Sequence, residues 1–490
     1  MTSSYITTTI PYVNGRPHLG HALEFVQADV LARYHRSTGQ QVRFQSGTDD
    51  NSLKNVLAAE AAGVGVQEFV DANAAAFTGL AEPLSLSFDD LIRTSSDPRH
   101  RAGVERLWRA CADSGDLYRK HYEGLYCVGC EQFYTTAELD GGRCQEHGTV
   151  PELVSEENWF FRLSRYAGQL RELIADGTIR IEPAERRNEV LALIDGGLED
   201  FSVSRSTERA RGWGIPVPGD PGQVIYVWWD ALGNYLTALD YADGGENLHR
   251  WWSAASRRIH LLGKGVLRFH AVYWPAMLLS AGYEPPQQLF VHGYLLLDDR
   301  KISKSLGNIV EPLELIDVYG VDALRFWMAR AVSFGQDGSA SVDGVRERYE
   351  TELANDLGNL LSRTTAMIAR YRDGKLVRGN AQAPLDLDAL GREVSDRFER
   401  LDVTGALEAV WQGVRRLNQY VGAEAPWQLA KDPGDADKLD LVLVSLIEGV
   451  RTVNTMLEPY MPGATAKLRA ALGAPGSTVS ALEPLFPKRS

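Results

Sequence analysis

Four residues in the first third of the chain have the spacing of a metal-binding knuckle. Cys127 and Cys130 form a Cys-x-x-Cys pair, and 13 residues separate Cys130 from a second pair, Cys144 and His147. Two close pairs of soft donors that face each other supply the four ligands of tetrahedral zinc. The sequence therefore predicts a structural zinc site, with an empty, vestigial knuckle as the alternative. Cys111 lies in an amphipathic pattern and is expected to be a buried apolar residue.

A second group of residues has the chemistry of a phosphate site. His18, Gly20 and His21 lie where a turn leads into a helical pattern. The start of a helix presents unpaired backbone N–H groups and a positive dipole end, and two imidazoles there can donate hydrogen bonds to phosphate oxygens. Glycine lets a phosphate or an adenine ring approach the backbone closely. Two surface histidines in a turn are the alternative.

A third group supplies mobile positive charge. Lys301, Ser303 and Lys304 lie about 280 residues after His21, behind an apolar run and a polar turn. Two lysines on a loop can follow phosphates as they separate. Taken alone, the five-residue run 301–305 is more often a solvated basic loop. The order, spacing and context of the two motifs agree, so together they predict an ATP site. A Walker loop at residues 263–265 is disfavoured because the required glycine spacing and Ser or Thr are missing.

The histidine and lysine motifs must be positioned by a fold, and the pattern of apolar residues predicts an α/β fold. The β-branched run 5–10 indicates a buried strand, a helical pattern ends at Gly39, and residues 42–44 alternate as a second strand. A β-α-β unit of this kind predicts a parallel, nucleotide-binding sheet. The α/β pattern returns at 223–226, 259–262 and 289–297.

The predicted organisation has five segments. Residues 116–200 interrupt the α/β pattern with the cysteines, and from about 345 apolar residues recur at three- and four-residue spacing. We therefore predict a Rossmann-type parallel-sheet catalytic domain with a zinc-knuckle insertion, followed by a C-terminal α-helical bundle. The predicted boundaries are 1–115 and 201–297 for the two catalytic halves, 116–200 for the insertion, 298–345 for the lysine loop with its connection, and 346–490 for the bundle.

Composition narrows the class of protein only a little. The net charge of −14 argues weakly against a nucleic-acid binder and does not exclude one with local basic tracks. The N-terminus lacks the basic and apolar regions of a signal peptide, and no run of 18 uncharged apolar residues is present. We expect a cytoplasmic protein with no membrane partner.

The histidine and lysine motifs together resemble the two signature sequences of class I aminoacyl-tRNA synthetases. The surrounding sequence resembles methionyl-tRNA synthetases over essentially the whole chain, including residues 10–15, 226–231 and 269–277. The resemblance implies that ATP, with Mg²⁺, activates methionine, which is then loaded onto tRNA(Met). It implies catalytic roles for His18, His21, Lys301, Lys304 and Arg205, and ATP binding by His18, Gly20, His21, Lys301, Ser303 and Lys304.

The resemblance also implies a methionine pocket. A long, polarizable thioether is best held by aromatic rings and a few apolar contacts, and an ammonium group requires a carboxylate. Asp49 matches the ammonium-binding position of the family, and core packing is the alternative role for each aromatic residue. The chain departs from the family pattern at Asn51, Ser52 and Gly265, which puts rate and specificity in question. The other positions that match the pocket are Ile10, Tyr12, Trp228, Ala231, Tyr235, Phe269, His270 and Tyr273.

The helical bundle carries a possible base-reading surface. Asn355, Asn359 and Arg363 recur every four residues on one predicted helix face, and Trp427 follows on a later segment. Side chains of these types can read base edges and stack on a splayed base. Asn359, Arg363 and Trp427 match anticodon-reading positions of the family, with a solvated face and a packing corner as alternatives. A monomer is expected.

Two other functions stay open at this point. One is a divergent paralogue that activates another amino acid or serves a biosynthetic or inhibitor-resistance role, as the departures at Asn51, Ser52 and Gly265 would allow. The other is a non-catalytic tRNA-binding protein. Exchange assays over a panel of amino acids, and charging of a methionine tRNA, separate the three.

Overall fold

The computed structural model describes residues 2–145, 148–297, 300–301, 311–339, 341–376, 386–474 and 477–488. The chain divides into two compact units, which are described separately. Unit 1 holds Met1–Pro17, Gly39–Ala81 and Ser87–Val291, and unit 2 holds His18–Thr38, Glu82–Leu86 and His292–Ser490.

Unit 1 is built on a six-stranded sheet with the order β3-β2-β1-β12-β13-β7. β1 pairs in parallel with β2 and β12, β2 with β3, and β13 with β7, which gives the predicted Rossmann-type topology. The strands are β1 (Ser3–Thr7), β2 (Gln41–Thr48), β3 (Asp90–Arg93), β7 (Arg180–Glu182), β12 (Arg257–Gly263) and β13 (Gln288–His292). Its helices are α2 (Leu53–Ala62), α3 (Val66–Thr78), α4 (Pro98–Asp113), α5 (Ala167–Ala175), α6 (Ala184–Asp195), α7 (Val227–Thr237), α8 (Glu246–Leu248) and α9 (Trp274–Ser280).

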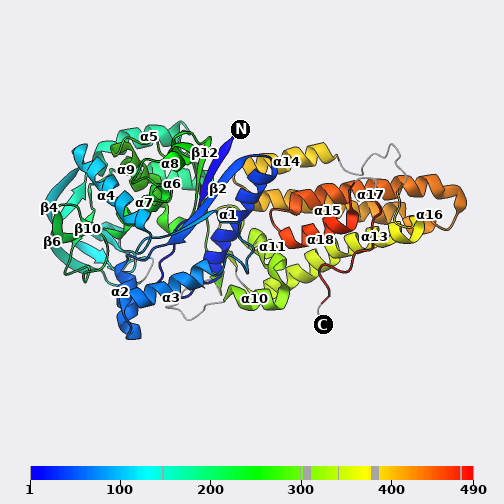
Figure 1. Cartoon of the computed structure of the whole chain (residues 1–490), viewed down its shortest axis with the longest axis horizontal. Coiled ribbons are helices and arrows are strands. Elements are labelled where there is room, and N and C mark those ends of the chain that lie inside the picture. Colours follow the sequence, from blue (N-terminus) through cyan, green and yellow to red (C-terminus); the bar gives the residue numbers. More distant parts are fainter. Residues whose placement is uncertain are drawn as a thin grey trace. The chain divides into compact units, whose positions relative to one another are not determined.

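The cysteine-bearing insertion is mainly antiparallel. Its sheet has the order β5-β4-β6-β8, and a second small sheet has the order β10-β11-β9. The bounds are β4 (Leu117–Cys127), β5 (Gln132–Tyr134), β6 (Glu152–Phe161), β8 (Phe201–Ser202), β9 (Ser204–Ser206), β10 (Pro216–Val217) and β11 (Asp220–Ile225). Figure 1 shows β4, β6 and β10 together in the cyan and green part of unit 1.

Unit 2 is helical, as predicted for the C-terminal part of the chain. α15 packs against α14 and α17, and α17 also packs against α13 and α18, which Figure 1 shows as yellow to red helices lying side by side. The helices are α1 (Leu19–Ser37), α10 (Pro312–Tyr319), α11 (Val321–Ala331), α12 (Val342–Arg348), α13 (Asn359–Arg372), α14 (Leu387–Glu399), α15 (Val403–Glu424), α16 (Pro426–Leu429), α17 (Ala436–Leu457) and α18 (Pro462–Leu472). The small strands are β14 (Leu295–Leu297), β15 (Arg300–Lys301) and β16 (Gly338–Ser339).

A buried arginine joins four segments of unit 2. The Arg325 guanidinium is fully buried and donates to Asp29 Oδ2 on α1 at 2.7 Å. It also donates to the carbonyls of Leu84, Pro459 and Tyr460 at 2.8 to 3.0 Å. Such a charge is tolerated in a core only because its donors are satisfied.

Three strand predictions need correction. The strand predicted at 5–10 ends at Thr7, and the chain then leaves the ladder ahead of Pro11, which has no N–H to donate. The strand predicted at 223–226 lies in the antiparallel hairpin of β10 and β11, turned at Gly219 (φ +80°), and not in the parallel sheet. The strand predicted at 289–297 is broken at Gly293, where a Cβ would lie 2.0 Å from the carbonyl oxygen of Gln336.

The helical prediction after residue 345 needs two refinements. Tyr349–Gly358 is a π-helix that continues directly into α13. The described residues after α18 form no helix. Among the described residues, no helix is long and apolar enough to cross a membrane.

Candidate active site

The histidine motif forms the N-terminus of α1. His18 is the N-cap residue, and its Nδ1 accepts a hydrogen bond from the backbone N–H of Gly20 at 3.1 Å. The backbone N–H of His18 donates in return to Nδ1 of His21 at 3.2 Å, and the two rings stack with centroids 3.8 Å apart. The first turn has no acidic residue, so the positive end of the helix dipole is not offset there.

This capping arrangement fixes how each imidazole can act. Because Nδ1 of His18 and of His21 both accept hydrogen bonds, the neutral rings carry their protons on Nε2. Each ring is therefore set to donate through Nε2, as a phosphate oxygen requires. Gly20 favours this geometry, since a Cβ there would lie 3.0 Å from Cε1 of His18 and would press on that ring. The glycine thus accommodates the His18 ring, a reason that the sequence did not indicate.

The lysine motif lies only partly within the described residues. The backbone of Lys301 pairs with Leu296 in the antiparallel ladder of β14 and β15. Ser303 and Lys304 lie outside the described residues. Their assignment to the ATP site remains a prediction.

Asp49 is a buried carboxylate whose environment is dominated by negative charge. It follows β2, its backbone N–H donates to the Pro11 carbonyl at 2.9 Å, and it forms a bridge with Tyr12. Among the described residues, its Oδ1 has no hydrogen-bond partner. Burial, reinforced by repulsion from Asp230 and Glu131, raises the pKa of Asp49 well above its usual range. An orphan carboxylate in such surroundings is suited to an ammonium ligand.

The residues that follow Asp49 have well-defined roles in the fold. Asp50 Oδ2 accepts from Arg93 at 2.8 Å and from Ser95 at 2.6 Å. Asn51 donates through Nδ2 to Asp230 Oδ2 at 2.7 Å. Ser52 is the N-cap of α2, and its hydroxyl accepts from the backbone N–H of Lys54 at 3.0 Å. Two of the three departures from the family pattern therefore support local structure; the third, Gly265, is an exposed residue of a short turn after β12.

Four of the predicted pocket residues form a chain of aromatic contacts. Tyr12 meets the edge of Trp228 at a centroid separation of 6.3 Å. Trp228 stacks on Phe269 at 3.7 Å, and Phe269 meets Tyr273 edge-on at 5.2 Å. Ala231, buried one helical turn after Trp228, adds a small apolar contact, and Ile10 is half-buried beyond β1. This wall has the polarizable surface that a thioether requires.

Tyr235 and His270 form a second, polar part of the predicted pocket. The Tyr235 hydroxyl lies 2.8 Å from Nε2 of His270, and Nδ1 of His270 lies 2.9 Å from the Val266 carbonyl. A carbonyl oxygen can only accept, so Nδ1 of His270 carries a proton. In the neutral ring, Nε2 then accepts from Tyr235, which holds both side chains in one orientation.

Arg205 is buried in an aromatic cage. Its guanidinium lies 4.3 Å from the Tyr226 ring centroid and about equally far, 5.0 and 5.1 Å, from those of Phe133 and Tyr126. Its Nη1 donates to Ser202 Oγ at 2.9 Å and to the Ser204 carbonyl. Arg205 lines a cavity of about 470 Å³, whose wall includes Tyr226 and Tyr273. The cage positions a permanent positive charge beside the aromatic wall.

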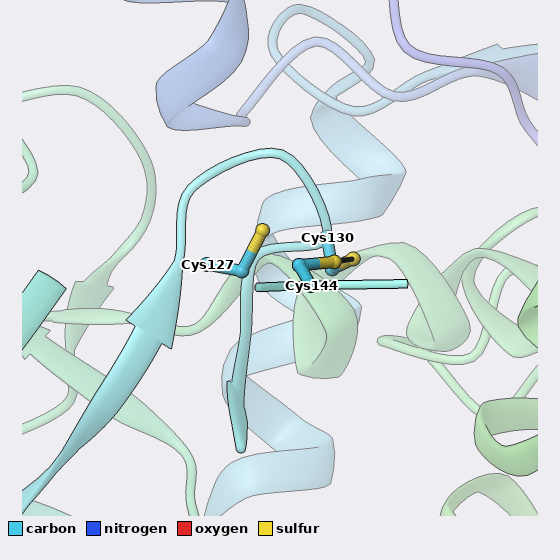
Figure 2. A group of neighbouring side chains, drawn as sticks. All are labelled: Cys127, Cys130 and Cys144. Atoms are coloured by element: carbon cyan, nitrogen blue, oxygen red, sulfur yellow. Dashed lines mark hydrogen bonds between the residues drawn. The ribbon is translucent and has the colours of Figure 1, made fainter. Parts of the chain in front are cut away.

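The three cysteines of the predicted knuckle converge. Figure 2 shows the three cysteines next to one another, with the sulfurs of Cys130 and Cys144 adjacent, and all three sulfurs lie within 4.8 Å of one another. Tetrahedral zinc with Zn–S bonds of about 2.3 Å places its sulfurs about 3.8 Å apart, so the cluster fits this ion. Burial raises the pKa of the Cys130 thiol, a cost that a bound cation offsets. His147, the predicted fourth ligand, lies outside the described residues.

The knuckle is attached to the amino-acid pocket. Tyr226 donates through its hydroxyl to the carbonyl of Glu131, and Trp228 Nε1 donates to the carbonyl of Cys130 at 3.4 Å. The Glu131 carboxylate accepts from the backbone N–H of Lys54 at 3.2 Å, and Lys54 Nζ lies 4.3 Å from the Tyr12 ring centroid. Glu131 and Lys54 were missed from the sequence, although the position of Glu131 directly after Cys130 was a usable signal.

The predicted base-reading stripe lies on one exposed face. Asn355, Asn359 and Arg363 are all exposed, along the π-helix and α13. Trp427, on α16, is half-buried, and the Arg363 guanidinium lies 5.2 Å from its ring centroid. An arginine over an indole, beside exposed amides, is a surface on which a base can stack and be read.

Cys111, expected to be buried, is fully buried on α4, where its thiol donates to the Met277 carbonyl at 3.6 Å. The sequence did not identify His100, which contacts Asp230. His100 lies in the first turn of α4, and a single histidine near the start of a helix is too common to indicate a role.

Comparisons with known proteins agree with this geometry. The family model described as "tRNA synthetases class I (M)" matches residues 4–145 and 134–365. The methionine–tRNA ligase of Caldanaerobacter subterraneus subsp. tengcongensis is 41% identical over 96% of this chain and 74% of its own length. That of Brucella melitensis is 40% identical over 99% of this chain and 97% of its own length. The structure of Mycobacterium tuberculosis methionyl-tRNA synthetase in complex with methionyl-adenylate matches with a TM-score of 0.91 at 38% identity and covers 100% of both chains.

Proposed function

The chain belongs to the methionine–tRNA ligase family of class I aminoacyl-tRNA synthetases, and we propose that it activates methionine with ATP and transfers it to tRNA(Met). The observation that carries the proposal is the buried Asp49 carboxylate, whose Oδ1 has no hydrogen-bond partner among the described residues, next to Tyr12 of the aromatic wall that Trp228 and Phe269 continue. This pairing offers one partner for an ammonium group and another for a thioether.

In the activation step, the methionine carboxylate attacks the α-phosphorus of ATP in line, and pyrophosphate leaves. His18 and His21 donate from Nε2 to phosphoryl oxygens at the start of α1, and Lys301 and Lys304 neutralise charge as the phosphates separate. Ser303 and Gly20 complete the ATP site, and Arg205 supplies fixed positive charge near the aromatic wall. Catalysis is then mainly positioning and electrostatic stabilisation.

For the amino acid, Asp49 holds the ammonium group. Ile10, Tyr12, Trp228, Ala231, Phe269 and Tyr273 surround the side chain, and Tyr235 with His270 supplies its polar contact. Asn359, Arg363 and Trp427 read the anticodon of the tRNA. The support for these assignments is the contact geometry described above together with the family membership.

Two metal ions are part of the proposal. Cys127, Cys130, Cys144 and His147 hold a structural zinc, because three of the four donors already converge. Zinc there fixes the loop from which Cys130 and Glu131 contact the pocket. Mg²⁺ accompanies ATP and supplies charge neutralisation for the pyrophosphate. We further propose a monomeric enzyme of the cytoplasm.

The proposal is tested by methionine-dependent ATP–pyrophosphate exchange and by charging of tRNA(Met). Lys304→Ala should lower kcat of exchange far more than it raises KM for methionine, because the lysine acts on the separating phosphates. An unchanged exchange rate in Lys304→Ala would refute its role. A preference for another amino acid over methionine in a substrate panel would refute the proposed substrate.

A further inference from the structure

Asp230 is the centre of a buried hydrogen-bonded network that the proposed reaction does not use. It lies in the first turn of α7, between the pocket residues Trp228 and Ala231, and is 1% exposed. One oxygen contacts Nε2 of His100, and the other accepts from Nδ2 of Asn51 at 2.7 Å. Both carboxylate oxygens are therefore held in one orientation by partners on α4 and on the segment that follows β2.

His100 is itself fixed on its other side. Its Nδ1 lies 2.8 Å from the Thr237 hydroxyl, which lies 3.3 Å from the Asn234 carbonyl. With the Thr237 hydroxyl donating to Nδ1 of the neutral ring, Nε2–H donates to the Asp230 carboxylate. α4 therefore holds Asp230 through His100.

The network reaches Asp49 through Asn51. Asn51 lies two residues after Asp49 and donates to the Thr94 carbonyl at 3.2 Å as well as to Asp230. Repulsion from Asp230 is the largest contribution, after burial, to the raised pKa of Asp49. Lys54 opposes this repulsion, but its effect on the pKa of Asp49 is smaller than that of each of the carboxylates of Asp230, Glu131 and Asp50, and the pKa stays raised. A further positive charge at the site, such as an ammonium group, would relieve the remaining repulsion.

We propose that Asp230 is a second anionic residue of the amino-group site, and that His100 and Asn51 are positioning residues that hold it near Asp49. The inference rests on the proposed function and deepens it. An ammonium group in the site gains from both negative charges. The thioether side chain, bound at the aromatic wall, gains from neither.

The test compares ligands with and without the ammonium group in the full-length chain. KM and kcat for methionine are measured by ATP–pyrophosphate exchange, with inhibition constants for methioninol, which keeps the ammonium, and 4-(methylsulfanyl)butanoate, which lacks it. Loss of a hydrogen bond to a charged group weakens binding by about tenfold to a hundredfold. His100→Leu and Asn51→Ala should weaken methionine and methioninol by this factor and leave the butanoate unchanged. His100→Gln, whose amide can donate to Asp230, should recover part of the loss.

Several outcomes would overturn the inference. Equal weakening of all three ligands would mean that the variants distort the whole pocket, and unchanged binding of all three would mean that Asp230 plays no part. Ser280→Ala is the matched control, because it removes a 2.7 Å donor to another buried carboxylate of unit 1, Asp116, and should change none of the constants. If His100→Leu fails to fold, the half-exposed Asn51 decides the question. A wild-type chain without methionine-dependent exchange would refute the proposed function instead.

Discussion

Asp49→Asn should stabilise the protein while it weakens methionine binding. The wild-type carboxylate is buried, has an orphan Oδ1 among the described residues, and is repelled by Asp230 and Glu131. An asparagine has the same shape without the charge, so the free energy of unfolding should rise by about 1–3 kcal/mol at neutral pH. The same change removes the proposed partner of the ammonium group, and KM for methionine should rise on the order of a hundredfold.

The pH dependence of this difference has a defined sign. The pKa of Asp49 is higher in the folded chain than in the unfolded chain, so the folded state is penalised when the carboxylate is ionised in both. The penalty is present above the folded pKa and disappears as the pH falls through it. The stability advantage of Asp49→Asn should therefore shrink toward acidic pH.

The neighbouring residue provides the matched control. Asp50 is equally buried, but its Oδ2 accepts from Arg93 and Ser95. Its Oδ1 also lacks a hydrogen-bond partner among the described residues, so the two residues differ in the ion pair with Arg93. Asp50→Asn breaks that ion pair and should destabilise the protein by about 3–5 kcal/mol. Urea unfolding of both variants, without methionine and across pH, is the assay. Destabilisation of Asp49→Asn to the extent of Asp50→Asn would refute the reasoning.

Three further predictions address other parts of the molecule. Gly20→Ala should lower kcat of exchange by about tenfold to a hundredfold with little change in KM for methionine, because its Cβ displaces the His18 ring; normal kcat would contradict this. Arg325→Met should destabilise the protein by about 3–5 kcal/mol in urea unfolding, whereas Arg469→Met, which breaks an exposed pair with Glu458, should cost about 0.5 kcal/mol or less. Treatment with a chelator should release zinc, measurable by atomic absorption. It should also raise KM for methionine about fivefold, because the hydrogen bond from Trp228 to the Cys130 carbonyl is lost. An unchanged KM in zinc-free protein would show that the knuckle does not influence the pocket.

The sequence was most informative where a residue type has one dominant chemical use. The paired spacing of the cysteines predicted a cluster, and the structure brings three of them together. The histidine motif predicted a helix start, and His18 is the N-cap of α1. Both predictions depend on local spacing, which a linear sequence preserves.

The sequence was least informative where partners are distant along the chain. His100 and Asp230 are separated by 130 positions, and neither residue type alone indicates the other. The strand predicted at 223–226 failed for the same reason, since a short apolar run does not specify whether it joins a parallel sheet or a hairpin. The role of Gly20 required the position of the His18 ring, which no pattern of types gives.

If Asp49 binds the ammonium group as proposed, the departures at Asn51 and Ser52 should bear on affinity and not on the choice of amino acid. Ser52 caps α2, and Asn51 binds Asp230, which we propose contributes to the ammonium site with Asp49. Every amino acid carries that group, and a change there shifts the binding of all of them together. Selection among side chains depends on the differences in contact at Tyr12, Trp228 and Phe269, where the chain keeps the aromatic types that a thioether requires. The specificity for methionine should therefore survive even variants of Asn51 that greatly weaken its binding.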